Sequence, residues 1–346
     1  MAGSDGTMSV RAHLRAGQVI PAHPLALTSD RRLDERRQRA LTRYYVESGA
    51  GGVAVAVHTT QFNIRDPEVG LFRPVLELAA ESARHAIGSS DRPFGLIAGV
   101  CGSTQQAVAE AEIASALGYH AALVSLGGSA WREASEAELV EHCRAVGEVL
   151  PVFGFYLQPS VGGRALSHAF WRELAELPAL WAVKIAPFNR YQTLDVVRAM
   201  VEAGRDDVAL YTGNDDNIVA DLLTPFPVHA GGRRVVRYMD GGLLGQWAVW
   251  TRGAVALLDR IRQARDAGRI DEALLSLGAA LTDANGAIFD VAHGFAGCIP
   301  GIHEVLRRDG LLDGIWCLDP AETLSPGQAE EITRVTLAYP ELAALA

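Results

Sequence analysis

The sequence predicts a (β/α)8 barrel, a TIM barrel, followed by a C-terminal helical region. Short apolar runs alternate with longer amphipathic runs, and eight such strand–helix units follow one another along the chain. Several runs are apolar on both faces, as parallel strands covered by helices require. Beyond about residue 248 the pattern is wholly helical. A doubly wound open sheet is the competing fold, but it does not need eight consecutive parallel units.

The expected strands are short and evenly spaced. The first seven are strongly apolar, and the eighth is less hydrophobic than the others. They cover residues 19–25, 52–57, 94–100, 121–126, 152–157, 180–187, 208–212 and 235–239.

Amphipathic segments separate the strands and predict helices. Ser103 or Thr104 can cap the helix that runs to Leu117. The other barrel helices are expected at 33–48, 74–87, 136–149, 168–177, 193–202 and 217–223, and later helices at 257–267, 271–293, 301–308 and 327–337. The predicted organisation is an N-terminal tail at 1–17, a barrel at 18–268, and a helical region at 269–346 packed on the barrel.

Composition limits the class of protein. Of the 346 residues 49% are hydrophobic and 21% charged, so a sizeable core can form and disorder is not expected. The net charge of -10 and the lack of a basic stripe argue against nucleic acid as a partner. No apolar stretch reaches the roughly 18 residues of a membrane span, and the first 17 residues lack the apolar core that a signal peptide would need, so neither is expected. Four scattered cysteines without a C-x-x-C pair fit a reducing cytoplasm.

One basic residue stands apart from the rest. The chain has 31 basic residues, of which 30 are arginine, and Lys184 is its sole lysine. It lies inside the apolar run 180–187. Arginine stays protonated in proteins, whereas a desolvated lysine can become a neutral amine nucleophile. This placement suggests covalent chemistry on a carbonyl group; the alternative is a coding bias towards arginine, with Lys184 extending from a strand end.

Other candidate residues gather at the carboxyl ends of the expected strands, where such barrels place their chemistry. Tyr156 lies in the strand before Lys184 and could relay protons while a carbinolamine forms and collapses. The alternative is that Tyr156 is a core residue whose hydroxyl group bonds a carbonyl. The remaining candidate residues at these ends are His23, His58, Thr59, Thr60, Gly213, Asn214, Asp215 and Asp240.

Four segments carry a resemblance to a known family. Residues 155–163 resemble a tyrosine motif, Y-N-x-P-x-x-x-G, and residues 183–186 resemble a Schiff-base lysine strand. Residues 58–60 resemble a G-T-T-G-E loop, and residues 212–215 an S-G-D-D turn. Tyr156 lies 28 residues before Lys184, as a strand–helix–strand step would give. Over nearly its whole length the chain resembles the dihydrodipicolinate synthase / N-acetylneuraminate lyase family of class I aldolases.

The resemblance implies a Schiff-base lyase. Lys184 would attack the ketone of a 2-oxo acid such as pyruvate and form a protonated imine, with Tyr156 shuttling protons. Thr59 and Thr60 would hold the carboxylate, with His58 and Gly213 also in the substrate site. The resemblance implies no metal or organic cofactor, because the lysine supplies the electrophile, and it implies a homo-oligomer, a dimer or tetramer.

The chain also departs from the family pattern. Gln61 and Phe62 follow the threonines in place of G-E, and Val161 stands where an arginine would hold the carboxylate of aspartate semialdehyde. Residues 127–131 replace the tyrosine pair after the fourth strand. Aspartate semialdehyde is therefore not the expected second substrate. Phe62 and Trp131 could form an aromatic wall suited to an aromatic or extended aldehyde.

Several alternatives remain open from the sequence. Arg190 could bind a substrate anion, or it could form an ion pair at the following helix. The same imine would also serve a dehydratase or hydratase-aldolase. An alternative from another functional class is a binding protein that keeps the keto-acid pocket of the barrel but has lost catalysis. His23, His58 and Asp240 could form the metal site of a class II aldolase. Asp215 and the following Asp216 are interpreted as N-cap residues rather than catalytic ones.

Overall fold

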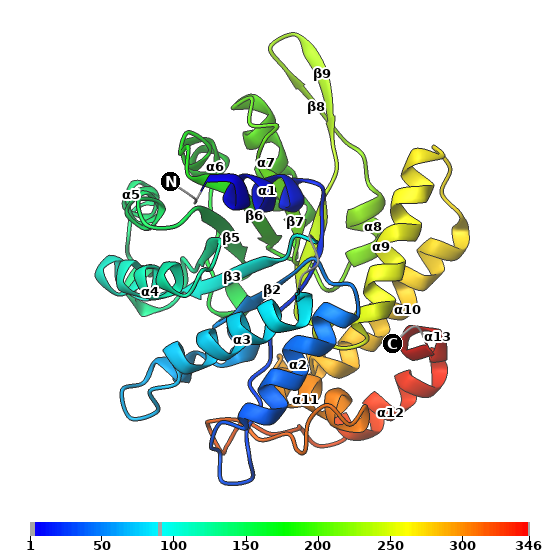
Figure 1. Cartoon of the computed structure of the whole chain (residues 1–346). Coiled ribbons are helices and arrows are strands. Elements are labelled where there is room, and N and C mark those ends of the chain that lie inside the picture. The colour runs from blue at the N-terminus through cyan, green and yellow to red at the C-terminus, as the bar shows by residue number, and fades with distance from the viewer. Residues whose placement is uncertain (1–3, 89–91, 345–346) are drawn as a thin grey trace.

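Eight parallel strands form a closed barrel in the computed structural model, which describes residues 4–88 and 92–344 (Figure 1). The strands lie side by side in the order β1, β10, β7, β6, β5, β4, β3, β2. A parallel bridge between Ala22 and Ala54 joins β1 to β2 and closes the barrel. The predicted fold class is confirmed. The barrel strands are β1 (Val19–Pro21), β2 (Gly52–Val55), β3 (Gly95–Val100), β4 (Ala121–Val124), β5 (Val152–Leu157), β6 (Leu180–Ala186), β7 (Ala209–Thr212) and β10 (Gly241–Leu244).

The helices of the barrel lie within a few residues of their predicted ranges, except that α9 begins at Thr251, six residues before the predicted start, and several begin at side-chain caps. Ser103 accepts a hydrogen bond from the backbone N–H of Gln106, which confirms it as the cap of its helix. Ser135 forms a capping box with Glu138 in the same way. The barrel helices are α2 (Glu35–Glu47), α3 (Phe72–Ile87), α4 (Thr104–Ala116), α5 (Glu136–Gly147), α6 (His168–Ala175), α7 (Arg190–Glu202), α8 (Ile218–Leu223) and α9 (Thr251–Asp266).

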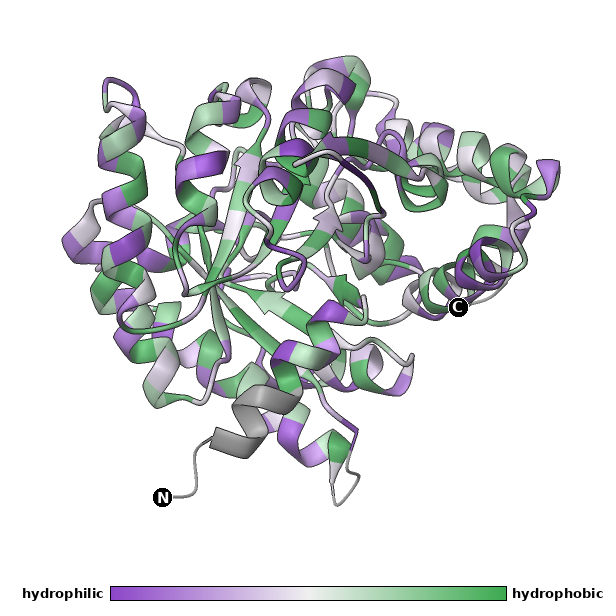
Figure 2. Cartoon of the chain, turned by 90° about the horizontal axis from the view of Figure 1, so that it is seen from above, coloured by the Kyte–Doolittle hydropathy of each residue, from purple (hydrophilic) through white to green (hydrophobic). Residues whose placement is uncertain are grey.

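Alternation along the strands divides the core into two layers. On β5 the side chain of Phe153 faces the barrel interior, whereas Val152 packs in the outer layer between strands and helices. The strands are hydrophobic along most of their length, while the surrounding helices mix hydrophobic and hydrophilic residues (Figure 2). The period of two therefore decides which strand residues can reach a cavity inside the barrel.

The N-terminal segment contains a helix where the sequence analysis expected a tail. Helix α1 (Ser4–Arg15) covers the amino-terminal end of the barrel, and Leu14 is fully buried there. The Tyr211 hydroxyl donates a hydrogen bond of 2.7 Å to the carbonyl oxygen of Leu14. Arg15 forms an ion pair with Asp240. The segment closes the barrel at the end opposite the strands' carboxyl termini.

The predicted eighth strand, 235–239, is wrong. Most of it belongs to β9 (Arg233–Arg237), which pairs antiparallel with β8 (Phe226–Ala230) in a hairpin that projects from the barrel (Figure 1). Gly231 and Gly232 turn the chain with φ values of +55° and +74°, a conformation that favours glycine. The barrel is completed by β10, a run of small and apolar residues that is buried throughout.

The C-terminal region is helical, as predicted, and packs against the barrel. The long helix predicted at 271–293 ends earlier, because Asp290 adopts a φ of +58° and a short loop follows. No helix among residues 4–88 and 92–344 combines the length and apolar character needed to cross a bilayer. The region comprises α10 (Glu272–Ile288), α11 (Cys298–Arg308), α12 (Gln328–Ala338) and α13 (Pro340–Ala344). The 3-10 turns are η1 (His58–Thr60), η2 (Phe62–Arg65), η3 (Ser129–Trp131), η4 (Pro159–Val161), η5 (Gln246–Ala248) and η6 (Val291–His293).

Candidate active site

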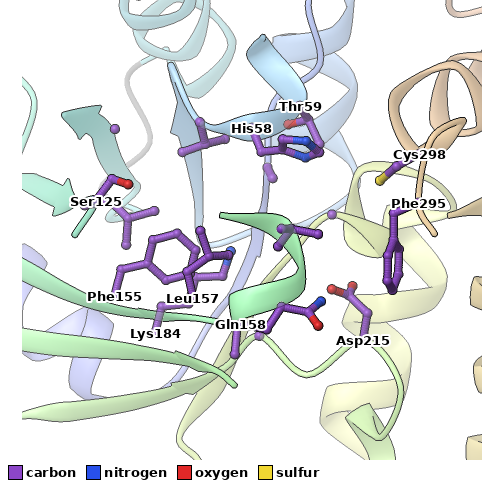
Figure 3. A pocket seen from close by; sticks show the side chains of 18 of the residues that line it. His58, Thr59, Ser125, Phe155, Leu157, Gln158, Lys184, Asp215, Phe295 and Cys298 are labelled. Carbon is purple, nitrogen blue, oxygen red and sulfur yellow. The ribbon is translucent and has the colours of Figure 1, made fainter. Parts of the chain in front are cut away.

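A cavity of about 320 Å³ opens at the carboxyl ends of the barrel strands (Figure 3). Its floor comes from the strand ends and its roof from the C-terminal region. The apolar lining includes Val100, Leu123, Phe155, Leu157, Val161, Phe188, Phe289, Phe295 and Ile302, and the polar lining includes His58, Thr59, Ser125, Gln158, Lys184, Asp215 and Cys298. This is the end of the barrel at which the sequence analysis expected the chemistry.

Lys184 projects into this cavity from β6. Its ammonium group lies 4.5 Å from the centroid of the Phe155 ring, and the two side chains lie together in the pocket (Figure 3). Gly213 provides the space on the other side, because a Cβ atom there would lie 2.7 Å from Cε of Lys184. The predicted lysine and Gly213 are thus brought together. Gly213 acts by leaving room for the lysine side chain.

The cavity pairs the lysine with a carboxyl group that the sequence analysis did not select. Burial lowers the pKa of Lys184 to about 8, and the charge of Asp215 opposes this shift. Burial raises the pKa of Asp215 to about 7, and Lys184 opposes that shift in turn. The two groups therefore titrate close together, within reach of neutral pH.

Asp215 is held in place by the C-terminal part of the chain. Its carboxylate accepts a hydrogen bond from the backbone N–H of Gln246, and its carbonyl oxygen accepts one of 2.7 Å from Nδ2 of Asn285 on α10. The interpretation of Asp215 as a helix cap is wrong, because the N-cap of α8 is Asn217. The one feature of the sequence that pointed to Asp215 was its place in the S-G-D-D-like turn. Its position in the cavity depends on the hydrogen bond from α10, which is distant in the chain.

Tyr156 does not face the cavity. Its side chain is fully buried in the outer core layer, where its ring lies 5.2 Å from that of Trp171. Its hydroxyl donates a hydrogen bond to the carbonyl oxygen of Leu166 and accepts one from the N–H of the same residue. This is the core environment that the sequence analysis gave as the alternative.

A one-residue irregularity explains the position of Tyr156. Val152 pairs with Leu180 but Phe153 pairs with Ala182, so Trp181 is an extra residue in β6. Without it, continuous pairing would set Tyr156 opposite Lys184. With it, Phe155 lies opposite Lys184, because a slip of one residue exchanges the two faces of a strand.

The loop after β2 supplies one threonine to the cavity, not two. Thr59 lines it, and its buried hydroxyl has no partner among the residues described. Thr60 is turned away: its hydroxyl donates to the carbonyl oxygen of His23 and accepts from the N–H of Val57. His58 also lines the cavity and is open to it, while burial and the Lys184 charge lower its pKa to about 4.

Arg190 does not line the cavity. It forms an ion pair with the fully buried Asp221, which also accepts hydrogen bonds from Thr212 and Asn214. Trp131, the other expected wall residue, donates its indole N–H to the carbonyl oxygen of Gly102 and stays outside the cavity lining. Phe62 does line the cavity, so only part of the expected aromatic wall is present.

The alternative metal set is not assembled. His23 is buried with its ring nitrogens bonded to Thr42 and to the backbone of Pro24, and Asp240 precedes β10 at the opposite end of the barrel, beside Arg15. Within the part of the chain that the structure describes, no three His, Cys, Asp or Glu side chains cluster as a metal site would need.

Residues around the cavity adopt unusual backbone conformations. Ala56, Phe188 and Phe295 all line it and have φ values of +62°, +53° and +70°. Such conformations are strained for residues with a side chain and gather at functional sites. Phe295 lies in the roof, next to Cys298, whose thiol pKa is raised by burial.

Comparison with known proteins identifies the family. A sequence profile described as the dihydrodipicolinate synthetase family matches residues 15–225, more than half of the chain. The chain belongs to this family. A search of curated proteins gives no significant match.

Several solved structures share the fold of this chain. N-acetylneuraminate lyase from Fusobacterium nucleatum is 17% identical, with a TM-score of 0.72 over 94% of this chain and 99% of that one. Dihydrodipicolinate synthase from Aquifex aeolicus is 18% identical, with a TM-score of 0.73 over 94% and 98%. YagE, an Escherichia coli K12 prophage protein of the family, is 18% identical, with a TM-score of 0.72 over 95% and 99%. The C-terminal helices therefore belong to the shared architecture.

Against the family motifs given by the sequence resemblance, this member of the dihydrodipicolinate synthetase family keeps the lysine and alters its surroundings. Lys184 and Thr59 face the cavity, whereas Thr60 and Tyr156 do not. Phe155 occupies the inner face beside the lysine. Among the described residues that line the cavity, Asp215 carries the one carboxyl group.

Proposed function

We propose that this protein is a Schiff-base lyase that acts on a 2-oxo acid such as pyruvate. The observation that carries the proposal is the sole lysine of the chain, which lies half-buried in a cavity at the strand ends with its pKa lowered to about 8. About a tenth of such amines are unprotonated at pH 7, against fewer than about one in a thousand for an ordinary lysine. Lys184 is therefore the nucleophile.

The lysine attacks as a nucleophile, and the iminium ion that it forms then serves as the electrophile. The amine lone pair forms a bond to the ketone carbon, and the carbonyl electrons move to oxygen, which leaves as water after protonation. The resulting iminium ion accepts the electron pair of a bond to the adjacent carbon. Loss of a proton or of an aldehyde fragment then gives the same enamine.

Thr59 is the proposed contact for the substrate carboxylate. Its hydroxyl is buried, lines the cavity, and lacks a protein partner in the described structure. A buried hydroxyl without a partner is costly, and a carboxylate oxygen would satisfy it. His58 is neutral over most of the pH range and offers a further hydrogen-bond donor beside it.

The walls limit the rest of the substrate to an uncharged, mostly apolar group. Phe188, Phe289 and Phe295 line the cavity, and the described lining contains no arginine. A second carboxylate or a phosphate would lose its water there with no cation to pair with other than Lys184, so binding of a second anionic group would be unfavourable. The proposed partner is an apolar or aromatic aldehyde, released or added at the enamine carbon.

The relatives support this proposal. The N-acetylneuraminate lyase from Fusobacterium nucleatum and the E. coli prophage protein were both solved with pyruvate. The alternatives from the sequence, a dehydratase or hydratase-aldolase and a non-catalytic keto-acid-binding barrel, use the same pocket and stay predictions. The predicted homo-oligomer and cytoplasmic location stay predictions as well.

Trapping the imine tests the proposal. The protein is incubated with pyruvate and sodium borohydride, digested with trypsin, and the peptides are weighed. We expect a reduced pyruvyl adduct on Lys184 and none on the matched variant Lys184→Met. Absence of an adduct with pyruvate and with a panel of larger 2-oxo acids would refute the Schiff-base function, whereas an adduct without turnover of any substrate would favour the binding barrel.

The same trap tests the character of the second half of the substrate. Phenylpyruvate and 2-oxoglutarate are offered together at equal concentration, and the two reduced adducts on Lys184 are compared by mass. The aromatic walls predict several-fold more phenylpyruvate adduct. An excess of the 2-oxoglutarate adduct would contradict the apolar assignment.

A further inference from the structure

Asp215 is the one carboxyl group among the described residues that line the cavity of Lys184. We infer that Asp215 is the general acid and base of the imine chemistry, in the role that the sequence resemblance assigned to Tyr156. This inference rests on the proposed function, because it concerns the proton transfers that follow attack by Lys184. It assigns a catalytic residue that lies on β7's turn rather than on β5.

The fold sets the Asp215 turn directly beside the lysine strand. Strands β6 and β7 are hydrogen-bonded neighbours, and Lys184 is in register with Tyr211. The N–H of Gly213 donates a hydrogen bond of 2.8 Å to the carbonyl oxygen of Ile185. Because Gly213 carries no Cβ, the lysine side chain can pack directly against it. Lys184 and Asp215 both line the cavity, and the charge of each shifts the pKa of the other.

Three groups fix the turn from the C-terminal side. Asn285 and Thr282, both on α10, donate side-chain hydrogen bonds to the carbonyl oxygens of Asp215 and Asp216, at 2.7 Å and 2.8 Å. The N–H of Gln246 donates to the Asp215 carboxylate. Asn285 is buried and acts on the carboxyl group only through its backbone, so it is a positioning residue. Holding an acid in one place is what proton transfer to a bound intermediate requires.

The other groups near the lysine are poorly suited to this role. The Tyr156 hydroxyl lies in the outer core and is bonded to Leu166. Burial lowers the pKa of His58 and raises that of Cys298, which makes the imidazole a weak base and the thiol a weak acid. Burial instead moves the pKa of Asp215 towards neutrality, where a carboxyl group can both give and take a proton.

The proton count balances with one carboxyl group. Neutral Lys184 and protonated Asp215 meet the ketone, and the C–N bond forms as the C=O electrons move to oxygen. One proton from the amine nitrogen and one from Asp215 then convert that oxygen to water, which leaves. The products are an iminium cation and the Asp215 carboxylate. The carboxylate then removes a proton from the adjacent carbon, and the C–H electron pair neutralises the iminium as an enamine. Asp215 is again protonated, ready to return its proton to the enamine carbon.

Exchange of the pyruvate methyl protons measures the proton transfer between iminium and enamine, and it does not require the second substrate to be known. The protein is incubated with pyruvate in deuterium oxide, and loss of the methyl proton signal is followed by NMR. We expect the wild type to catalyse exchange and Lys184→Met to define the background. In Asp215→Asn, exchange falls by roughly 100-fold or more, while prolonged borohydride trapping still gives the Lys184 adduct.

Two matched variants test whether the effect of Asp215→Asn comes only from the loss of a nearby negative charge, and whether Tyr156 carries the acid–base role instead. Asp216→Asn removes the neighbouring carboxylate, which lies outside the cavity lining, and should leave exchange within about two-fold of wild type. Tyr156→Phe should likewise keep exchange, with a lower melting temperature because Leu166 loses two hydrogen bonds. Circular dichroism checks that each variant is folded; should Asp215→Asn fail that check, Asp215→Ala is assayed with and without added formate, which should restore exchange.

The outcomes keep the two proposals apart. If the wild type gives neither adduct nor exchange, the Schiff-base function fails. If it gives both, and a folded Asp215→Asn or formate-free Asp215→Ala exchanges at the wild-type rate, Asp215 is not the acid and base. Loss of exchange in Tyr156→Phe at full folding would return the role to the tyrosine.

Discussion

The ammonium group of Lys184 lies 4.5 Å from the centroid of the Phe155 ring, on the inner face of the barrel. The face of an aromatic ring stabilises a nearby cation by roughly 0.5–2 kcal/mol, more when water is excluded. Phe155 therefore works against the desolvation that lowers the lysine pKa. The neighbour of Lys184 is an aromatic ring without a hydroxyl group.

Replacing Phe155 should make the lysine more acidic. In Phe155→Leu we expect the pKa of Lys184 to fall by about half a unit to one unit, because the ammonium form loses the ring. The measurement is the pH dependence of the initial rate of borohydride trapping with saturating pyruvate. Phe289→Leu, a cavity phenylalanine without this contact, is the control and should leave the pKa in place.

The rate of pyruvate proton exchange should follow a bell-shaped pH profile. Below the pKa of about 7 of Asp215 both groups are protonated, and above the pKa of about 8 of Lys184 both are deprotonated. The reactive form combines a neutral amine with a protonated carboxyl group, so the pair holds one of its two titratable protons. This form is most populated between the two pKa values. Removing the carboxyl group in Asp215→Asn should abolish the alkaline limb; a limb that persists there would contradict the assignment.

Gly213 should resist even the smallest side chain. The Cβ atom of Gly213→Ala would lie 2.7 Å from Cε of Lys184 and 2.8 Å from Cβ of Ala186, so the lysine must move. We expect imine trapping to slow by roughly 10- to 100-fold, since a displacement near 1 Å has such effects. Gly286→Ala, on α10 where a Cβ meets open space, should leave trapping intact and raise stability by about 0.5–1 kcal/mol.

Arg190 should matter for stability and not for chemistry. Its loss in Arg190→Ala leaves the buried Asp221 without its ion-pair partner, which we expect to cost about 1–3 kcal/mol of unfolding free energy. Urea denaturation measures that cost, and trapping with pyruvate should be unchanged. Arg198→Ala, in an exposed pairing along the same helix, should shift stability by about 0.5 kcal/mol or less. A large loss of pyruvate affinity in Arg190→Ala would restore the anion-binding interpretation.

The sequence predicted the repeated strands and helices because each is a local pattern. Helix α5 and strand β5 were placed to within two residues from periodicity and capping alone. The eighth strand was misplaced because residues 235–239 are apolar enough for a strand, and pattern does not say with which partner a strand pairs. The helix in residues 4–15 was missed because its burial depends on the barrel end that it covers.

The place of Lys184 in the cavity could be predicted from the sequence, because a unique lysine inside an apolar strand is a local feature and the strand order sets the end of the barrel at which it lies. The orientations of Tyr156 and Asp215 could be seen only in the tertiary structure. One extra residue at Trp181 reversed the facing of β5 against β6, and residue counting along the chain cannot detect such a slip. Asp215 reached its place through α10, some 70 residues later in the chain. Local pattern determined the fold and the position of the lysine, whereas strand register and long-range hydrogen bonds decided which side chains share the cavity with it.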